Sequence, residues 1–257
     1  MKQPIKIIIH KLYKRYVRGL IRREIARQRF KLILWDIFGY LPLVFYNNLR
    51  ISQRIKLIRR LIIVDYNVVH AHKPCEIVPV ILSILDGRGK KGVVIEAGCW
   101  HGGSSAKLSL ACELAECKFL IFDSFEGVEF GDPNSDQKHF YGQYNSTEAV
   151  VKANISKFGC LAVCEFKKGW FKDSFLNFSM NVRVVYIDCD LVKGTFEVLN
   201  GIVRNLSKDS EVFTQDYHIL PIRAALSNEE MWRSIAISKV PEIKEIARNL
   251  ARIVVNS

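Results

Sequence analysis

Residues 92–123 read GVVIEAGCWHGGSSAKLSLACELAECKFLIFD, and their pattern gives the clearest indication of the fold class. It begins with a short apolar run that ends at Gly98 and continues with a segment of helical composition from Gly103 to Cys117. A second apolar run, 118–123, then ends at Asp123. Short apolar runs that alternate with helical segments are typical of parallel strands joined by helices. We therefore expect a strand–helix–strand unit here.

The same alternation continues toward the C-terminus. We expect further strands at 162–169, 182–188 and 211–216, and helices at 146–158, 191–206 and about 222–235. Ser146 is the expected N-cap of the first of these helices. Residues 126–146, rich in Gly, Asp, Asn, Ser and Tyr, are interpreted as a long lid loop, and 251–255 as an edge strand. The predicted fold class is α/β, a parallel sheet with helices on both faces.

The positive charge of the chain is concentrated at its N-terminus. The 257 residues carry a net charge of +12, yet residues 1–60 hold sixteen Lys and Arg against two acids, Glu24 and Asp36. Apolar spacing predicts an amphipathic helix over 5–34 and a second basic helix over 49–61; Pro74 begins a third. We therefore divide the chain into a basic, helical N-terminal region, 1–74, and an α/β domain, 75–257, which would be the catalytic domain of an enzyme.

Composition excludes several classes of protein. With 49% apolar and 25% charged residues the chain is neither disordered nor collagen-like. Its seven cysteines have no regular spacing, and no second pair completes a zinc set with Cys160 and Cys164. We expect a reduced, cytoplasmic protein without a signal peptide. The longest apolar run, 33–46, is shorter than the roughly 20 residues that a membrane span needs.

The residues that follow the predicted strands carry the functional signal, because ligands bind at the carboxyl ends of parallel strands. Acidic residues recur at four of these five ends. The five segments are Glu96-Ala-Gly98-Cys-Trp100-His-Gly102-Gly103, Asp123-Ser124-Phe125, Gly169-Trp170, Asp188-Cys-Asp190 and Gln215-Asp216-Tyr217.

The loop after the first strand has the character of a cofactor loop. Gly98 permits a tight turn, and Gly102 or Gly103 lets the helix start approach a ligand. Asp123 lies where an acid commonly holds a ribose diol. Together these features predict an adenosine-type cofactor, and the absence of a P-loop lysine argues against ATP. The alternative is an ordinary strand–turn–helix whose acid caps a helix.

The acids after the fourth and fifth strands suggest a cation site. Adjacent strand ends lie roughly 5 Å apart, so Asp188 and Asp216 can converge on Mg²⁺, with Gln215 or water completing the oxygen ligands. A carboxylate beside the metal can accept a proton from a bound hydroxyl. Alternatively, Asp188 is a helix N-cap and Asp216 a loop acid.

Six motifs in order, EAGCWHGGSSAK, FDSFEG, YGQYNSTEAVVKANI, KKGWFKDSF, YIDCDLVKGTFEVL and TQDYH, resemble the macrocin O-methyltransferase family. The resemblance covers about residues 92–218. It implies a Rossmann-like class I methyltransferase that uses S-adenosylmethionine and Mg²⁺ to methylate sugar hydroxyls of glycans or glycosylated metabolites.

The resemblance also implies roles for individual residues. Glu96, Gly98, Gly102 and Ser104 surround the methionine part of the cofactor, with Trp100 in the same loop. Asp123 holds the ribose, and Ser124 and Trp170 lie near the adenine. Asp188 and Asp216 are implied metal ligands, and Asp188 is the implied base.

The chain departs from the family pattern in the segments around the implied metal ligands, Asp188 and Asp216. Gln215 replaces the first of two acids, 190–195 read DLVKGT where the family has D-L-Y-x-S-T, and Asp209-Ser210 replaces Gly-Gly. An uncharged Gln215 is expected to lower metal affinity. Two alternatives therefore stay open: a metal-independent O-methyltransferase with His139 or His218 as base, and a non-catalytic membrane-surface protein that keeps the fold.

The basic N-terminal region allows three interpretations. It can dock on an anionic membrane, which suits a lipid-linked sugar acceptor and a position on the inner membrane face. It can pack on the catalytic domain or on a second subunit of a homo-oligomer. Nucleic acid is the least favoured partner, because no recognised nucleic-acid module accompanies the charge.

Overall fold

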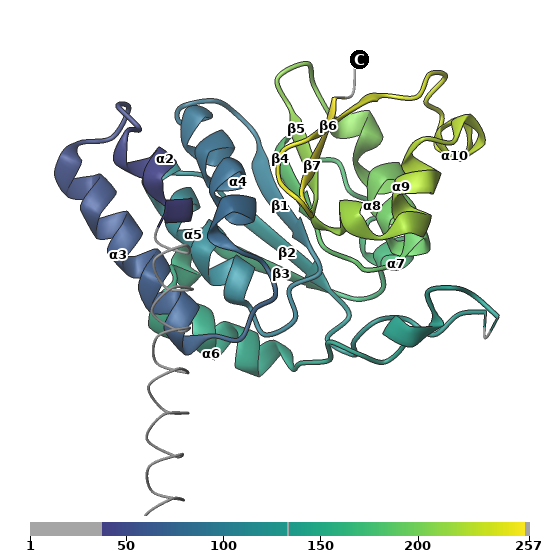
Figure 1. Cartoon of the computed structure of the whole chain (residues 1–257), viewed down its shortest axis with the longest axis horizontal. Helices are drawn as coiled ribbons and strands as arrows, with labels where there is room; N and C mark the ends of the chain where they lie inside the picture. The colour runs from purple at the N-terminus through teal and green to yellow at the C-terminus, as the bar shows by residue number, and fades with distance from the viewer. Residues whose placement is uncertain (1–37, 133, 255–257) are drawn as a thin grey trace, which may run out of the picture.

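The computed structural model describes residues 38–132 and 134–254, in which helices cover both faces of a central sheet (Figure 1). The helix predicted over 5–34 lies outside the described residues. The helices are α2 (Leu41–Val44), α3 (Ile51–Asn67), α4 (Pro74–Asp86), α5 (Gly103–Ala115), α6 (Glu148–Phe158), α7 (Phe171–Ser174), α8 (Val192–Ile202), α9 (Leu220–Leu226) and α10 (Glu229–Ser234). The strands are β1 (Val93–Ala97), β2 (Phe119–Asp123), β3 (Cys164–Lys168), β4 (Val182–Ile187), β5 (Glu211–Thr214), β6 (Glu242–Glu245) and β7 (Ala251–Val254).

The strand order is β3-β2-β1-β4-β5-β7-β6. The first five strands are parallel, as predicted. From β1 the chain runs outward to β3 and then returns to β4, so the switch point lies between β1 and β4. The strand predicted at 251–255 is confirmed as β7, but its edge position is wrong: β7 lies between β5 and β6, antiparallel to both. The true edge is β6, whose short, charged sequence EIKE gave no strand signal.

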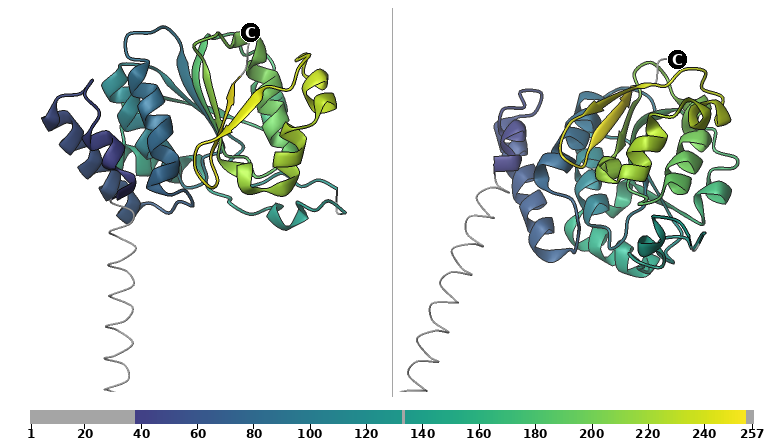
Figure 2. Two further views of the ribbon diagram at one scale, coloured as in Figure 1. Left: turned by 45° about the horizontal axis from the view of Figure 1, so that its top comes forward. Right: turned by 45° about the vertical axis from the view of Figure 1, so that its right-hand side comes forward.

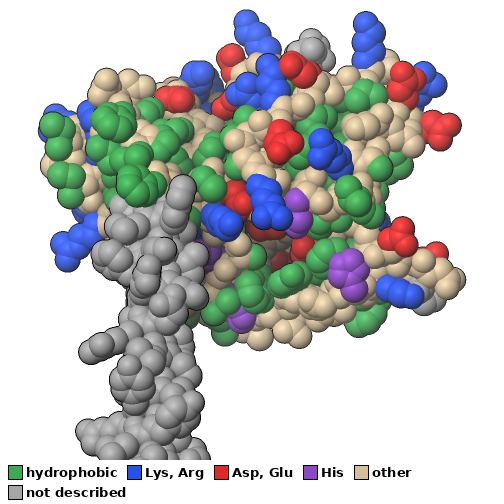
Figure 3. Space-filling view, viewed as in Figure 1, with side chains coloured by type: hydrophobic (Ala, Val, Ile, Leu, Met, Phe, Trp, Pro, Cys, Tyr) green, Lys and Arg blue, Asp and Glu red, His purple; other side chains and the backbone are tan. Residues whose placement is uncertain are grey.

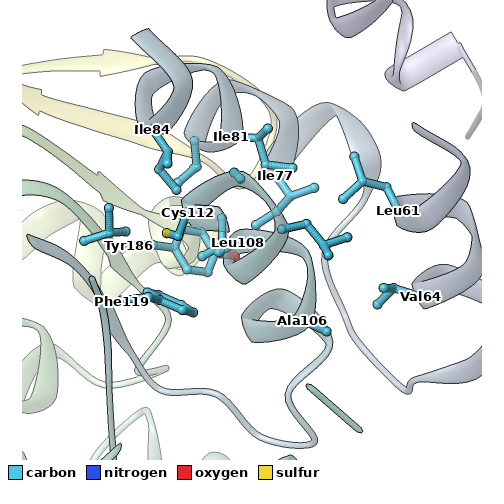
Figure 4. Close-up of a cluster of buried hydrophobic side chains, with 14 of the residues drawn as sticks. Leu61, Val64, Ile77, Ile81, Ile84, Ala106, Leu108, Cys112, Phe119 and Tyr186 are labelled. Carbon is cyan, nitrogen blue, oxygen red and sulfur yellow. The ribbon is translucent and has the colours of Figure 1, made fainter. Parts of the chain in front are cut away.

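Two hydrophobic cores hold these layers together, one on each face of the sheet. In both views of Figure 2 the helices lie in two layers with the sheet between them. Figure 4 shows the core on the side of α4 and α5, where Ile77 and Ile81 of α4 meet Leu108 of α5 above Phe119 and Tyr186 of the sheet. The other core packs α7, α8 and α9 on the opposite face.

Helix α3 extends the first of these cores. Leu57, Leu61 and Val64 form its buried stripe and join the cluster that contains α4 and α5. These positions follow the 3–4-residue spacing of an amphipathic helix. The expected boundary between residues 74 and 75 thus falls inside a shared hydrophobic cluster.

Local capping explains two differences from the predicted helices. Thr147, rather than Ser146, caps α6 and accepts a hydrogen bond from the Val150 amide at 3.3 Å. The helix expected over 222–235 is two helices, because Asn228 accepts a bond from the Glu230 amide and begins α10.

Candidate functional site

One cleft, with a cavity volume of about 330 Å³, lies at the carboxyl ends of the parallel strands. Its lining includes nine of the eleven residues that we predicted for the site: Gly98, Trp100, Ser104, Asp123, Ser124, Trp170, Asp188, Gln215 and Asp216. Glu96 and Gly102 are not part of the lining, whereas Asp190, which we did not predict as a site residue, is. Figure 3 shows the hollow near its centre, with acidic side chains inside it and histidines at its margin. The volume is within the range of small-molecule sites.

Asp123 is held in a fixed orientation at the end of β2. One carboxylate oxygen accepts the Cys99 amide at 2.7 Å, and the other accepts the Phe125 amide, also at 2.7 Å. A carboxylate offers about four acceptor positions. The two amide bonds therefore orient Asp123 and leave acceptor capacity for a diol in the cleft.

The glycine loop brings the ends of β1 and β4 together. Gly98 has φ +87°, and a Cβ at this position would overlap the Asp188 carbonyl. Gly103 lies against His70, whereas a Cβ at Gly102 would meet Val151 of α6 at 2.9 Å. Thus Gly98 and Gly103 allow close approach at the cleft, and Gly102 serves packing behind it.

Glu96 lies beneath the cleft. It is fully buried, and its carboxyl group accepts a hydrogen bond from the Ser105 hydroxyl. Burial raises the pKa of Glu96 to about 8, and the charge of Asp123 adds to this shift. Its side chain supports the start of α5 from below instead of lining the cavity.

Asp188, Asp190 and Asp216 gather at the ends of β4 and β5. The Asp216 carboxylate accepts the amides of Cys189 at 2.8 Å and Asp190 at 2.9 Å. Burial raises the pKa of Asp188 well above its usual value, and neighbouring Asp216 raises it further. Burial likewise raises the pKa of Asp190 to about 8. No Lys or Arg of the described residues lines the cleft, so the backbone amides and His218 are what face this acidic cluster.

Gln215 is connected to the fold behind this cluster. Its amide oxygen accepts the Tyr186 hydroxyl at 3.2 Å, and its nitrogen donates to Glu76 of α4 at 3.0 Å. The prediction that Gln215 is a metal ligand gains no support from these bonds. Across 38–132 and 134–254, no three His, Cys, Asp or Glu side chains are grouped to hold a metal.

The predicted lid, 126–146, projects beyond the sheet in Figure 1 (teal, lower right) but is fixed to the cleft at its base. Buried Gln137 donates to the Asp190 carbonyl at 2.9 Å and accepts the Val192 amide at 3.0 Å. Sequence analysis did not identify Gln137, because a lone Gln in a polar loop carries no pattern. Tyr144 lines the cleft and contacts Trp100 edge-on at 5.3 Å.

The α3–α4 connection forms a cleft wall that we did not predict. His70 and His72 line the cavity, and their rings stack at 4.6 Å. His70 contacts Asp65 at 3.0 Å, and Lys107 of α5 pairs with Asp65 and approaches the His72 ring nitrogen at 2.9 Å. Lys107 is fully buried. This polar cluster anchors the connection to α5.

His218 and His139 are the alternative bases suggested by the sequence, and His101 belongs to the glycine loop; of these, His218 lines the cleft. His139 is exposed in the lid, with its Nδ1 3.0 Å from the Asp136 carbonyl, and is not part of the lining. His101 contacts the Ser146 hydroxyl at 3.1 Å, also outside the lining. His218 is therefore the histidine of these three that the structure places at the site.

Comparison with known sequences agrees with this geometry. Residues 81–242 match the model of the macrocin O-methyltransferase (TylF) family. A relative from Streptomyces olivaceus, 8-demethyl-8-(2,3-dimethoxy-α-L-rhamnosyl)-tetracenomycin-C 4′-O-methyltransferase, is 32% identical over 151 residues. The match covers 54% of this chain and 58% of the relative, so the chain spans little more than half the length of that enzyme.

Solved structures share the fold. The O-methyltransferase NovP superposes with a TM-score of 0.65 at 18% identity, over 79% of this chain and 98% of NovP. The calicheamicin methyltransferase CalS11 gives 0.53 at 16% identity, over 87% of this chain and 93% of CalS11. The S-adenosylhomocysteine-bound Podospora anserina methyltransferase PaMTH1 gives 0.50 at 9% identity, over 78% and 88%. With the family model matching most of its length, the chain belongs to the macrocin O-methyltransferase family.

Proposed function

We propose that this protein transfers a methyl group from S-adenosylmethionine to a hydroxyl group of a sugar. The observation that carries the proposal is the convergence of Asp123, Asp188 and Asp216 on one cleft. Three strands widely separated in sequence supply these acids, which a purely structural sheet has no reason to gather. Family membership and the named activity of the rhamnosyl O-methyltransferase relative support the sugar acceptor.

The β1–β2 side of the cleft fits the cofactor. Asp123 keeps acceptor capacity for the ribose hydroxyls, and Gly98 and Ser104 line the adjoining space at the start of α5. Ser124 and Trp170 line the same cavity and suit the adenine, because an indole offers a flat apolar face. The acidic lining also suits a sulfonium cation.

The β4–β5 side fits the acceptor and its proton. Asp188 is proposed as the base: it accepts the hydroxyl proton while the oxygen attacks the methyl carbon in line and the carbon–sulfur bond breaks. Asp216 fixes the backbone of the loop that follows Asp188 through the amides of Cys189 and Asp190. Most of the rate enhancement then comes from positioning the two reactants.

Mg²⁺ is proposed as a further component. Asp216 is buried and Asp188 beside it is half-buried, and no Lys or Arg stands in the described cleft lining, so the two carboxylates form a donor pair that suits Mg²⁺ with water and substrate oxygens. Bound there, the ion would acidify an acceptor hydroxyl. Gln215 is engaged with Tyr186 and Glu76, so the two aspartates would hold it.

Methyl-transfer assays with rhamnosyl glycosides as acceptors test this proposal, with mass spectrometry of the products. We expect a singly methylated sugar, and a loss of about 10²-fold or more in kcat for Asp188→Asn. Asp209→Asn, at an exposed acid away from the cleft, is the matched control. Absence of S-adenosylhomocysteine binding by folded protein in calorimetry would refute the cofactor assignment.

The metal has its own test. Activity that is lost in EDTA and restored by Mg²⁺ supports it, whereas full activity in EDTA excludes it. In the second case His218, which lines the cleft, is the alternative base, and His218→Gln should then abolish transfer. A non-catalytic role would be indicated by cofactor binding without transfer to any acceptor.

A further inference from the structure

Helices α2 and α3 expose a large apolar surface on the side away from the core. Phe45 is 72% exposed, Ile51 68% and Ile55 62%. Figure 3 shows hydrophobic side chains gathered at the left, in the region where Figure 1 places α2 and α3. Other exposed apolar residues of this surface are Phe38, Leu41, Val44, Ile63 and Tyr66. Contiguous exposed apolar surface of this kind usually marks an interaction site.

Basic side chains lie on the same face. Lys56 and Arg59 are exposed, and at 100° per residue they share one side of α3 with Ile55 and Tyr66. Neither forms an ion pair with a carboxylate of the described residues. From Ile37 to Val64 the sequence contains no Asp or Glu. The face is therefore both apolar and cationic.

We propose that this face of α2 and α3 docks on the surface of an anionic lipid membrane. Apolar side chains would enter the boundary between headgroups and acyl chains, and Lys56 and Arg59 would remain at the level of the lipid phosphates. The buried stripe Leu57, Leu61 and Val64 stays in the protein core, so docking requires no unfolding. No helix in the described part of the chain is long and apolar enough to cross a bilayer.

The positive charge of this face favours an anionic lipid surface over a second copy of the chain or its own residues 1–37. A second copy of this face would bring Lys56 and Arg59 against their own equivalents, since the face supplies no acid to pair with them. Residues 1–37 carry eleven Lys and Arg against two acids, so that segment also repels the face electrostatically. An anionic membrane, by contrast, attracts both the α2–α3 face and the basic residues of 1–37.

Docking in this manner would place the cleft close to the membrane. Helix α3 leads directly into the connection that carries His70 and His72, two residues of the cleft wall. Val69, also in the lining, is 59% exposed. An acceptor sugar presented at the membrane surface would thus be near the site, although the docking itself does not depend on the proposed methyl transfer.

Vesicle flotation with the full chain tests the proposal. We expect binding to vesicles of phosphatidylcholine with phosphatidylglycerol, and at least about tenfold weaker binding to phosphatidylcholine alone or in high salt. Phe45→Ser with Ile55→Ser should weaken binding about tenfold or more, and Lys56→Gln with Arg59→Gln should do so mainly on anionic vesicles.

The controls are matched in type and exposure. Leu176→Ser removes a side chain that is 76% exposed outside α2 and α3, and Lys208→Gln with Lys239→Gln removes two exposed charges elsewhere. Both controls should bind vesicles like the unmodified chain. Thermal unfolding midpoints show whether each variant is folded.

Three results would overturn the proposal. The full chain does not bind anionic vesicles; or it binds, but the α2–α3 variants bind as well as the controls; or sedimentation shows an oligomer that the Phe45 and Ile55 substitutions dissociate. The second result would assign membrane binding to another segment, and the third would assign the face to a second copy of the chain.

Discussion

Substituting Gly98 by Ala should disable the site by moving Asp188, the proposed base. Gly98 has φ +87°, and an added Cβ would lie 2.9 Å from the Asp188 carbonyl carbon and closer still to its oxygen. The backbone there is fixed on both sides, because the Gly98 amide donates to Phe122 at 3.0 Å and the Asp188 amide donates to Ala97 at 2.9 Å. The loops can relieve this overlap only by separating.

The magnitude follows from two contributions. A non-glycine residue in the left-handed region costs about 1–2 kcal/mol. Relief of the overlap requires a shift of about 1 Å at Asp188, and a misplacement of that size can cost about 10²-fold in rate. We therefore expect kcat to fall about 10²-fold and the affinity for S-adenosylhomocysteine to fall as well, since Gly98 also lines the cleft.

Gly89→Ala provides the matched control. Gly89 has φ +79°, but an added Cβ would meet no atom within 4 Å. It should lose stability from the backbone conformation alone and keep full cofactor affinity. Denaturant unfolding, calorimetry with S-adenosylhomocysteine and transfer kinetics would compare the two variants. If Gly98→Ala matched Gly89→Ala in all three, the close contact with Asp188 would have no functional importance.

Three further predictions concern ionisable side chains in or beside the site. Asp123→Asn, which cannot accept both backbone amides, should weaken S-adenosylhomocysteine binding about 10–100-fold in calorimetry; unchanged affinity would contradict the ribose assignment. Because the folded-state pKa of Glu96 is about 8 and its ordinary value 4.5, the folded state holds the extra proton between these pH values. Stability should therefore fall as pH rises from 4.5 to 8, by up to about 5 kcal/mol. Glu96→Gln should flatten this dependence in denaturant titrations, and an unchanged slope would place the proton elsewhere. Lys107→Met removes the fully buried partner of Asp65, whose side chain is 19% exposed and keeps its contact with His70, so it should cost about 3 kcal/mol of unfolding free energy, the low end for a buried pair. Lys118→Met, at a surface pair, should cost under about 1 kcal/mol; equal losses would refute a structural role for the Asp65–Lys107 pair.

The sequence predicted the elements whose signals are local. The apolar run that becomes β1 and the glycine loop after it specify their own backbone, and Asp123 follows β2 as expected. The rule that ligands bind at strand ends then placed Asp123, Asp188 and Asp216 in one cleft without knowledge of the sheet order. The structure has all three in the cleft lining.

Features that depend on contacts between distant segments could not be predicted in this way. Glu96 follows the same strand-end pattern as Asp123, but it points beneath the loop to Ser105. Alternation along β1 cannot reveal this, because all five β1 residues are buried. Gln215 likewise has the right position for a ligand, yet Tyr186 and Glu76 engage its amide. Where a strand is buried on both faces of the sheet, its sequence has no apolar–polar alternation to show which side chains point into the cleft.

Helix α3 shows why the described part of the basic N-terminal region, residues 38–74, should not be regarded as a separate attachment. Its stripe of Leu57, Leu61 and Val64 shares a core with α5, and the Asp65–Lys107 pair ties the end of α3 to the same helix. Helix α5 begins at the glycine loop, so displacement of α3 would be transmitted to the cofactor side of the cleft through a buried ion pair that tolerates little separation. Any partner that binds α3 is thereby positioned to affect the site, which a flexible basic extension could not do.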